Sequence, residues 1–149
     1  MSRRLLPLAL ALALALIAGL AGAADGKAVY DTHCASCHQP DGAGADGLAP
    51  PLQGTLGKRL AVRQYVPGIV LTGLAGKMVS KGVTYTGMMP SWAQLADTEL
   101  AAVVNYVLGS FNAAELPAAH TPFTPEDFAA LRASKPTAKQ LRAWRAETD

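Results

Sequence analysis

The stretch Cys34-Ala35-Ser36-Cys37-His38 contains the only two cysteines of this 149-residue chain, and several kinds of site compete for it. A disulfide across two intervening residues closes a very short loop and stabilises a fold little. A thioredoxin-like redox pair needs a preceding strand and a following helix. Here a helix is expected over residues 25–33, and a Gly/Pro-rich loop follows residue 38. A tetrahedral zinc site needs two further ligands, and His33 and His120 are not spaced to supply them.

Covalent attachment of a haem explains the cysteine spacing and the histidine together. Two thiols separated by two residues reach the two vinyl groups of one porphyrin and form thioether bonds. His38, the next residue, is then held below the iron, where its imidazole nitrogen becomes the proximal ligand. The motif therefore predicts one haem c, attached covalently through Cys34 and Cys37.

A six-coordinate haem iron needs a second axial ligand on the opposite face of the porphyrin. The sequence offers five candidates, which are His33, Met78, Met88, Met89 and His120. His33 is adjacent to the first cysteine and cannot reach that face. Met89 precedes Pro90 in a loop far along the chain from the proximal ligand, and methionine ligation raises the reduction potential. We therefore expect Met89 to be the distal ligand, with Met88 as the alternative.

Residues 1–24 have the organisation of an export signal. Two arginines near the start are followed by a long run of leucine and alanine and then by small residues. Cleavage is expected near Ala23 or Ala24. Haem is coupled to thiols outside the cytoplasm, so export to the periplasm agrees with the motif. Residues 5–24 are also long enough to span a bilayer, and the protein is membrane-tethered if this segment is not cleaved.

The composition of the remainder excludes two classes of protein. Residues 1–24 contain two of the 13 basic residues and none of the 11 acidic ones, so the rest of the chain is close to neutral. A nucleic-acid binder would show a basic excess on one face. Low net charge and adequate apolar content also exclude a disordered chain. One domain with a modest core is expected, as a monomer or as a subunit of a redox complex.

Four segments, residues 34–38, 49–52, 87–92 and 103–107, occur in an order that resembles class I c-type cytochromes. The likeness covers about residues 25–111, and it is to the single-haem type that serves periplasmic dehydrogenases. It implies an all-α domain wrapped around one covalently attached haem.

The resemblance also implies a role for individual residues. Cys34 and Cys37 would attach the haem, and His38 and Met89 would coordinate its iron. The carbonyl of Pro50 would accept a hydrogen bond from the proximal histidine and so fix its ring. Side chains lining the haem are expected among Leu52, Val70, Leu74 and Trp92, for each of which ordinary core packing is the alternative.

The apolar pattern agrees with a mostly helical fold, because no run alternates long enough for a good strand. One face of a helix of roughly four turns is expected to hold Leu100, Val103, Val104, Val107, Leu108 and Phe111. Ala96 stands where a capping Ser or Thr is usual, so Asp97 is expected to cap this helix. A further short helix is expected over residues 66–73.

The first helix carries a glycine that permits another helix to cross closely. In the family the N- and C-terminal helices cross at such a point. Gly26 and Tyr30 are therefore expected to meet Val103, Tyr106 or Val107.

Residues 112–149 form a proline-containing extension with one or two short helices, the first beginning at Pro125 and the second spanning residues 138–146. Its apolar side chains either dock on a partner or pack back on the domain. They are Phe123, Phe128, Leu131, Leu141 and Trp144.

These features predict a one-electron carrier rather than an enzyme. Such a carrier needs no general base or nucleophile, and none is evident in the sequence. The expected partners are periplasmic redox proteins, a dehydrogenase as donor and a terminal oxidase or reductase as acceptor. The alternatives are a fixed electron-transfer subunit of such a complex and a ligand-binding haem protein with a displaceable distal ligand. Local steering of partners is expected from Lys58, Arg59, Arg63, Lys77 and Lys81, or these are ordinary solvated side chains.

Overall fold

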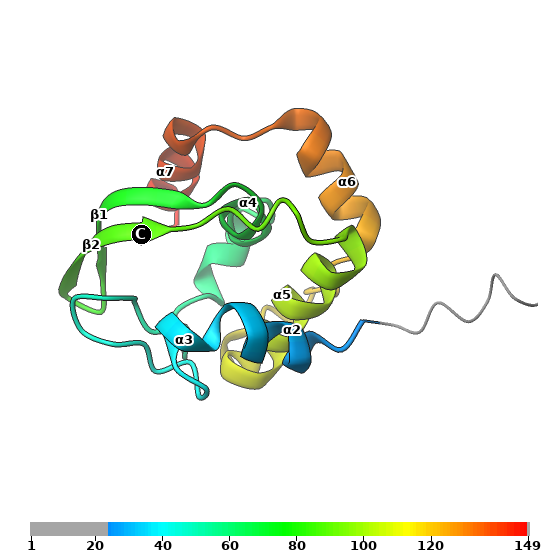
Figure 1. Ribbon diagram of the computed structural model, residues 1–149. Helices are drawn as coiled ribbons and strands as arrows, with labels where there is room; N and C mark the ends of the chain where they lie inside the picture. Colours follow the sequence, from blue (N-terminus) through cyan, green and yellow to red (C-terminus); the bar gives the residue numbers. More distant parts are fainter. Residues whose placement is uncertain (1–23, 149) are drawn as a thin grey trace, which may run out of the picture.

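A computed structural model describes residues 24–148, so the predicted export signal lies outside the described residues except for Ala24. The described residues form helices and one hairpin, and the hairpin lies at one side of the molecule (Figure 1). The elements in chain order are α2 (Gly26–His33), α3 (Ala35–His38), η2 (Lys58–Ala61), α4 (Tyr65–Thr72), β1 (Leu74–Ser80), β2 (Val83–Met89), α5 (Asp97–Phe111), η3 (Ala113–Glu115), α6 (Pro125–Ser134) and α7 (Ala138–Ala146). Within the described residues, no helix is long and apolar enough to cross a membrane.

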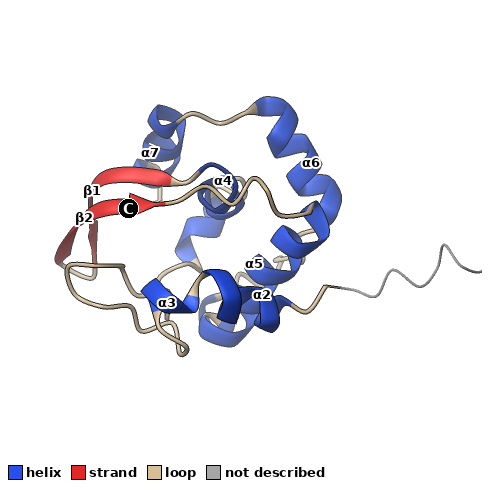
Figure 2. Ribbon diagram, in the orientation of Figure 1, coloured by secondary structure: helices blue, strands red, loops and turns tan. Residues whose placement is uncertain are grey.

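Strands β1 and β2 form an antiparallel hairpin, which the expectation of an all-helical fold missed (Figure 2). Ser80 pairs with Val83 across a two-residue turn, in which Lys81 and Gly82 both have positive φ angles of 48° and 78°. Turns of this kind match the natural twist of a hairpin. On β2 only Tyr85 is buried, so the strand lacks the clear apolar alternation that would have revealed it.

Helices α2 and α5 cross at Gly26, where their backbones approach closely. A Cβ atom at Gly26 would overlap the carbonyl oxygen of Ala102 and would lie 2.9 Å from the Cβ of Tyr106. One turn later the Tyr30 ring packs against Tyr106, with ring centroids 5.5 Å apart. Tyr30 also packs against Phe111 at 5.3 Å. The predicted meeting of Gly26 and Tyr30 with Tyr106 is thus observed.

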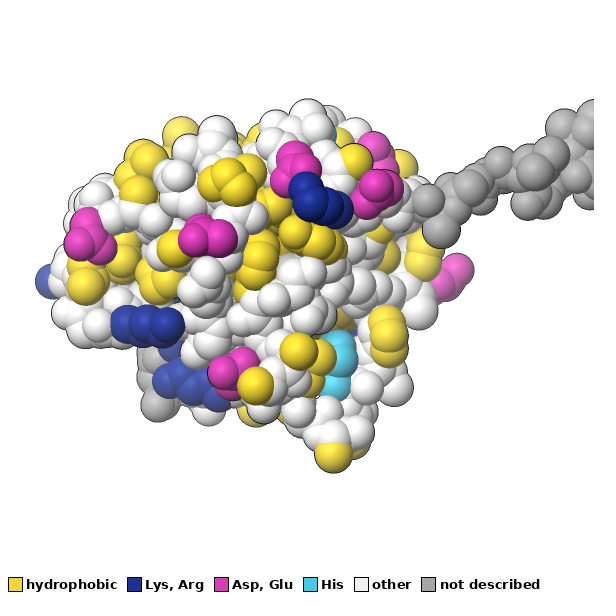
Figure 3. Space-filling model, turned by 90° about the horizontal axis from the view of Figure 1, so that it is seen from below, with side chains coloured by type: hydrophobic (Ala, Val, Ile, Leu, Met, Phe, Trp, Pro, Cys, Tyr) yellow, Lys and Arg dark blue, Asp and Glu magenta, His cyan; other side chains and the backbone are white. Residues whose placement is uncertain are grey.

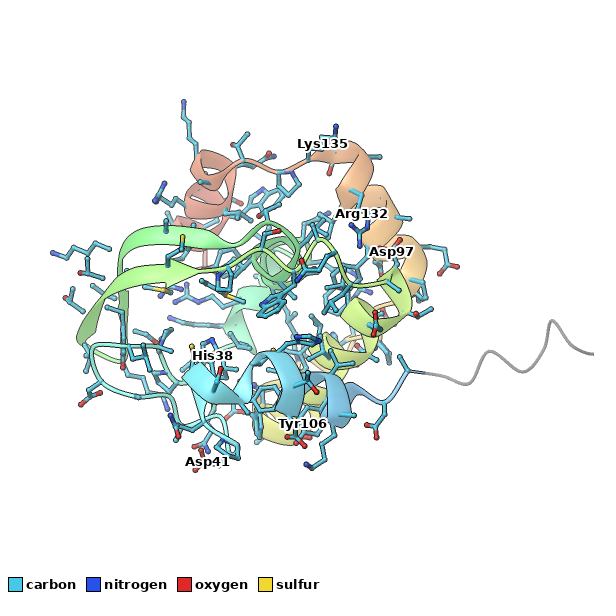
Figure 4. All side chains as sticks on the ribbon, in the orientation of Figure 1. His38, Asp41, Asp97, Tyr106, Arg132 and Lys135 are labelled. Carbon is cyan, nitrogen blue, oxygen red and sulfur yellow. The ribbon has the colours of Figure 1, made fainter. Side chains whose placement is uncertain are left out.

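The start of α5 differs from the expectation that Asp97 caps the helix. The carboxylate of Glu99 accepts a hydrogen bond of 2.8 Å from the backbone N–H of Ala96 instead. Asp97 accepts a 2.6 Å hydrogen bond from Nε of Arg132 on α6, and the two side chains point toward one another in Figure 4. Asp97 was wrongly predicted as the cap because its partner lies 35 positions further along the chain.

The extension packs back on the domain. Helix α6 lies against α4 and α5, and α7 lies against α4 and β1. Phe128 and Leu141 are fully buried in these contacts. Asn105 of α5 holds the segment before α6, because its side chain both donates to the Phe123 carbonyl and accepts from the Phe123 N–H, each at 2.8 Å.

Two members of the predicted steering patch are held by the extension. Arg59 is only 5% exposed and is therefore not a surface charge. Arg63 is partly exposed, donates to the Thr121 carbonyl and pairs with Asp127 of α6 at 3.0 Å. Arg59 thus leaves the patch, because the end of the chain covers it. Seen from below, the molecule carries interspersed basic and acidic side chains with hydrophobic ones between them (Figure 3).

Candidate functional site

The Cys-x-x-Cys-His motif folds as a helical turn directly after α2. The backbone N–H of Cys34 donates to the Tyr30 carbonyl at 2.8 Å, and that of His38 donates to the Cys34 carbonyl at 2.9 Å. A helix therefore precedes the motif and a loop follows it, which is the reverse of the thioredoxin arrangement. The two thiols are not joined in a disulfide. Burial raises the pKa of Cys34 to about 11, so it lacks the acidity of a redox-active thiol.

A zinc site at the motif is not supported either. In the part of the chain that the structure describes, no three His, Cys, Asp or Glu side chains gather to hold a metal ion. His120 lies instead beside Phe123, with ring centroids 6.0 Å apart.

His38 is 8% exposed, and its Nδ1 lies 2.9 Å from the carbonyl oxygen of Pro50. A carbonyl oxygen can only accept, so Nδ1 carries the proton of the neutral ring and the lone pair is left on Nε2. Burial lowers the pKa of His38, although the bond to Pro50 opposes this effect. The imidazole is thereby held in the tautomer that binds a metal through Nε2.

The loop between α3 and Pro50 is folded back by a glycine. Gly44 has a φ of +74°, and a Cβ atom there would lie 2.7 Å from the carbonyl carbon of Pro50. Its N–H donates to the His38 carbonyl at 2.9 Å. This close approach brings the Pro50 carbonyl to the histidine ring.

A mostly apolar cavity of about 460 Å³ lies beside this motif. In Figure 1, α3 lies below the cavity-lining strand β2. All seven predicted binding residues line the cavity, which the structure thus brings together: Cys34, Cys37, His38, Pro50, Leu52, Met89 and Trp92. The other two expected wall residues, Val70 and Leu74, line it as well.

The end of β2 presents two adjacent methionines to the cavity. Met88 is 77% exposed, whereas Met89 is half-buried. The loop that follows is fixed to α4, since Ser91 Oγ donates to the Leu71 carbonyl at 2.7 Å and the Trp92 N–H donates to the Val70 carbonyl at 3.1 Å. Of the remaining candidates for the distal position, Met78 and His33 line the cavity and His120 is not among its lining residues.

Two cationic side chains of the cavity wall were not predicted there: Arg59 was expected only as a steering charge at the surface, and Arg145 was not singled out at all. Arg59 donates to Thr148 Oγ1 at 2.9 Å, and Arg145 of α7 donates to the Tyr65 hydroxyl at 3.1 Å. Arg145 is far from the motif in sequence, and no local pattern indicates that α7 returns to the cavity.

The cavity has a volume within the range of cofactor sites and an apolar wall suited to a porphyrin. Two unpaired thiols and an oriented imidazole meet at that wall, so the residues present fit a covalently held haem. This combination defines the class of c-type cytochromes.

Comparison with known proteins agrees with that class. The family model described as Cytochrome c matches residues 23–110, and the chain therefore belongs to the cytochrome c family, in which it is a class I c-type cytochrome. It is 42% identical over 138 residues to a cytochrome c-552 of Thermus thermophilus, covering 90% of this chain and 93% of the relative.

Two further relatives are informative. A second cytochrome c-552 of Thermus thermophilus is 42% identical over 125 residues, which cover 82% of this chain and 95% of the relative. The fructose dehydrogenase cytochrome subunit of Gluconobacter japonicus is 31% identical over 98 residues, which are 61% of this chain and 19% of that subunit. The family implies covalently bound haem c and a role as an electron carrier rather than an enzyme.

Proposed function

We propose that the protein is a periplasmic electron carrier with one haem c. Cys34 and Cys37 would form the two thioether bonds to the haem, and His38 and Met89 would be the proximal and distal ligands that hold its iron. Haem c held by these residues would supply one-electron redox chemistry between a donor and an acceptor. A dehydrogenase is the proposed donor, and a terminal oxidase or reductase is the proposed acceptor.

The chain's own residues have three tasks in this function. The Pro50 carbonyl fixes the proximal imidazole, which keeps its ring orientation constant. The bonds from Ser91 and Trp92 to α4 hold the methionine loop in place. The apolar wall excludes water and so favours the less charged, reduced state of the site.

The hydrogen bond between His38 and Pro50 at the wall of the apolar cavity carries this proposal. It leaves Nε2 as the one ring nitrogen able to bind iron, beside the two thiols. Met89 is favoured over Met88 because its side chain is half-buried at the cavity, while Met88 is mostly in solvent.

The test is to express the full chain in cells that mature c-type cytochromes and to collect the periplasmic fraction. Intact mass should show loss of the export signal and addition of one porphyrin. The oxidised spectrum should show the weak band near its red edge that reports sulfur bound to iron, and the protein should titrate as a single one-electron couple. A colourless product, or a mass without porphyrin, contradicts the proposal.

A fixed subunit of a dehydrogenase is a second candidate, which the likeness to the fructose dehydrogenase cytochrome subunit supports. In that protein the matched part is 19% of a longer chain. The apolar residues of the extension are already buried against this domain, which favours a free carrier. Co-purification of a stable complex from the native periplasm would favour the fixed subunit instead.

A further inference from the structure

Three arginines of the C-terminal extension donate to backbone carbonyls on either side of the two cavity methionines. Arg142 of α7 donates from Nη2 to the Ala75 carbonyl, and Arg145 donates from Nη2 to the Val79 carbonyl. Arg132 of α6 donates to the Ala93 and Leu95 carbonyls, each at 2.6 Å. The hairpin and the loop after it, which together carry Met88 and Met89, are therefore held by the extension from both ends.

The two α7 arginines cap the free edge of the hairpin. Ser80 and Val83 flank the two-residue turn, so the backbone N–H and C=O groups of Ser80 and of every second residue before it on β1 point toward β2. Ala75 and Val79 lie at the positions in between. Their carbonyls therefore point away from β2, toward α7. An edge carbonyl without a strand partner needs another donor or water. Arg142 and Arg145, three positions apart on one helix face, supply it.

Strand β1, whose free edge these arginines cap, pairs with the end of β2 that carries the two methionines. Leu74 pairs with Met89 and Ala75 pairs with Met88, so the Ala75 carbonyl held by Arg142 belongs to a residue directly opposite a cavity methionine. On the other side of Met89, Arg132 bridges the loop to the start of α5, where it also pairs with Asp97. Figure 4 shows Arg132 and Asp97 facing one another beside this loop.

We propose that Arg132 and Arg142 are positioning residues for the distal ligand, and that the extension serves to keep Met89 on the cavity. Neither arginine lines the cavity, so each acts only through the backbone that it holds. Hydrogen bonds from charged donors are stronger than neutral ones, and two arginines that each hold a backbone segment bias the methionine loop toward its cavity-side position. The inference rests on the proposed function, because it takes Met89 as the ligand.

The experiment measures how easily an added ligand displaces the methionine. Oxidised wild-type protein and the variants Arg132→Ala, Arg142→Ala and their combination are titrated with imidazole at fixed pH and ionic strength. Loss of the red-edge sulfur–iron band is followed. We expect the double variant to bind imidazole about tenfold more tightly than the wild type, which is the size of effect that loss of such bonds gives.

Two matched controls separate positioning from general loss of stability. Arg63→Ala also removes hydrogen bonds between the domain and the extension, but these lie at Thr121, Pro122 and Asp127, away from the methionine loop. It should lower the unfolding temperature and leave imidazole binding unchanged. Lys139→Ala removes a charge from α7 where the side chain is exposed, and should change neither.

Equal imidazole affinity in the wild type and the double variant overturns the inference. So does an equal gain of affinity in Arg63→Ala, because the effect would then follow stability rather than the methionine loop. A wild-type protein that lacks the sulfur–iron band while carrying haem overturns the proposed ligand itself, and this outcome is distinguishable because it appears before any variant is compared.

Discussion

Met88 and Met89 are adjacent on β2 but differ in their surroundings, and this difference predicts different effects of substitution. Met89→Ala should abolish the red-edge band and lower the reduction potential, because the soft thioether that favours reduced iron is lost. Met88→Ala is the matched control and should keep both properties, since its side chain is 77% exposed. Spectra and redox titrations of the two variants provide the measurement. A band lost in Met88→Ala and kept in Met89→Ala would reverse the assignment.

Tyr30 predicts a pH dependence of stability. Its hydroxyl donates to the Gln39 carbonyl at 2.6 Å, and burial raises the pKa of Tyr30 to about 12 from its usual value of 10.0. The folded state therefore keeps the phenol proton over a range in which the unfolded state loses it. The contribution to stability is fully present below pH 10 and is lost as the pH rises toward 12.

Tyr30→Phe tests this behaviour, because phenylalanine cannot ionise. The variant should be less stable at neutral pH by about 1 kcal/mol, the net worth of the lost hydrogen bond. Its free energy of unfolding should fall less steeply than that of the wild type between pH 10 and 12. Urea unfolding at several pH values measures both. Parallel curves for the two proteins across this range would exclude Tyr30 as the source of the pH dependence.

At the level of elements, the crossing of α2 and α5 depends on a single missing side chain. Gly26→Ala places a Cβ against the Ala102 carbonyl and Tyr106, so the helices must separate and we expect a loss of about 1–3 kcal/mol. Gly109→Ala on α5 is the control, because its Cβ would meet nothing within 4 Å. It should stabilise the helix by about 0.5–1 kcal/mol. Thermal unfolding of both variants checks the opposite signs.

Elements with a strong local signal could be predicted from the sequence, and the hairpin could not. Helix α7 spans the predicted residues 138–146, because Pro136 and the capping Thr137 define its start locally. The hairpin has a Lys81-Gly82 turn instead of the commoner Asn-Gly or Asp-Gly, and glycines interrupt both of its strands. Its position is fixed instead by contacts with α7, far away in the sequence.

The same contrast applies to the site. The sequence could predict that Cys34, Cys37 and His38 lie together at one site, because they fall within five consecutive residues that match a haem-attachment motif. Arg59 and Arg145 could not, because their place at the cavity depends on the extension returning across the domain. A charged residue is more often solvated than buried, and nothing near Arg59 in the sequence indicates that it is buried.

For the whole molecule, the extension predicts how the domain depends on its C-terminal residues. Removing residues 125–149 uncovers α4 and α5 and deletes the buried side chains of Phe128, Leu131 and Leu141. Each contributes about 1.5–3 kcal/mol by burial, so the free energy of unfolding should fall by several kcal/mol. Denaturant unfolding of haem-loaded full-length and truncated protein measures the loss.

Phe128→Ala keeps this prediction testable if the truncated chain does not accumulate. The ring is fully buried, so its loss should cost about 3–5 kcal/mol, whereas Ala129→Ser at an exposed position of the same helix should cost about 0.5 kcal/mol or less. A docking arm would behave in the opposite way. Truncation would then leave the unfolding midpoint unchanged and abolish binding to the redox partner. The apolar side chains of a docking arm pack against the partner protein and not against the interior of this domain.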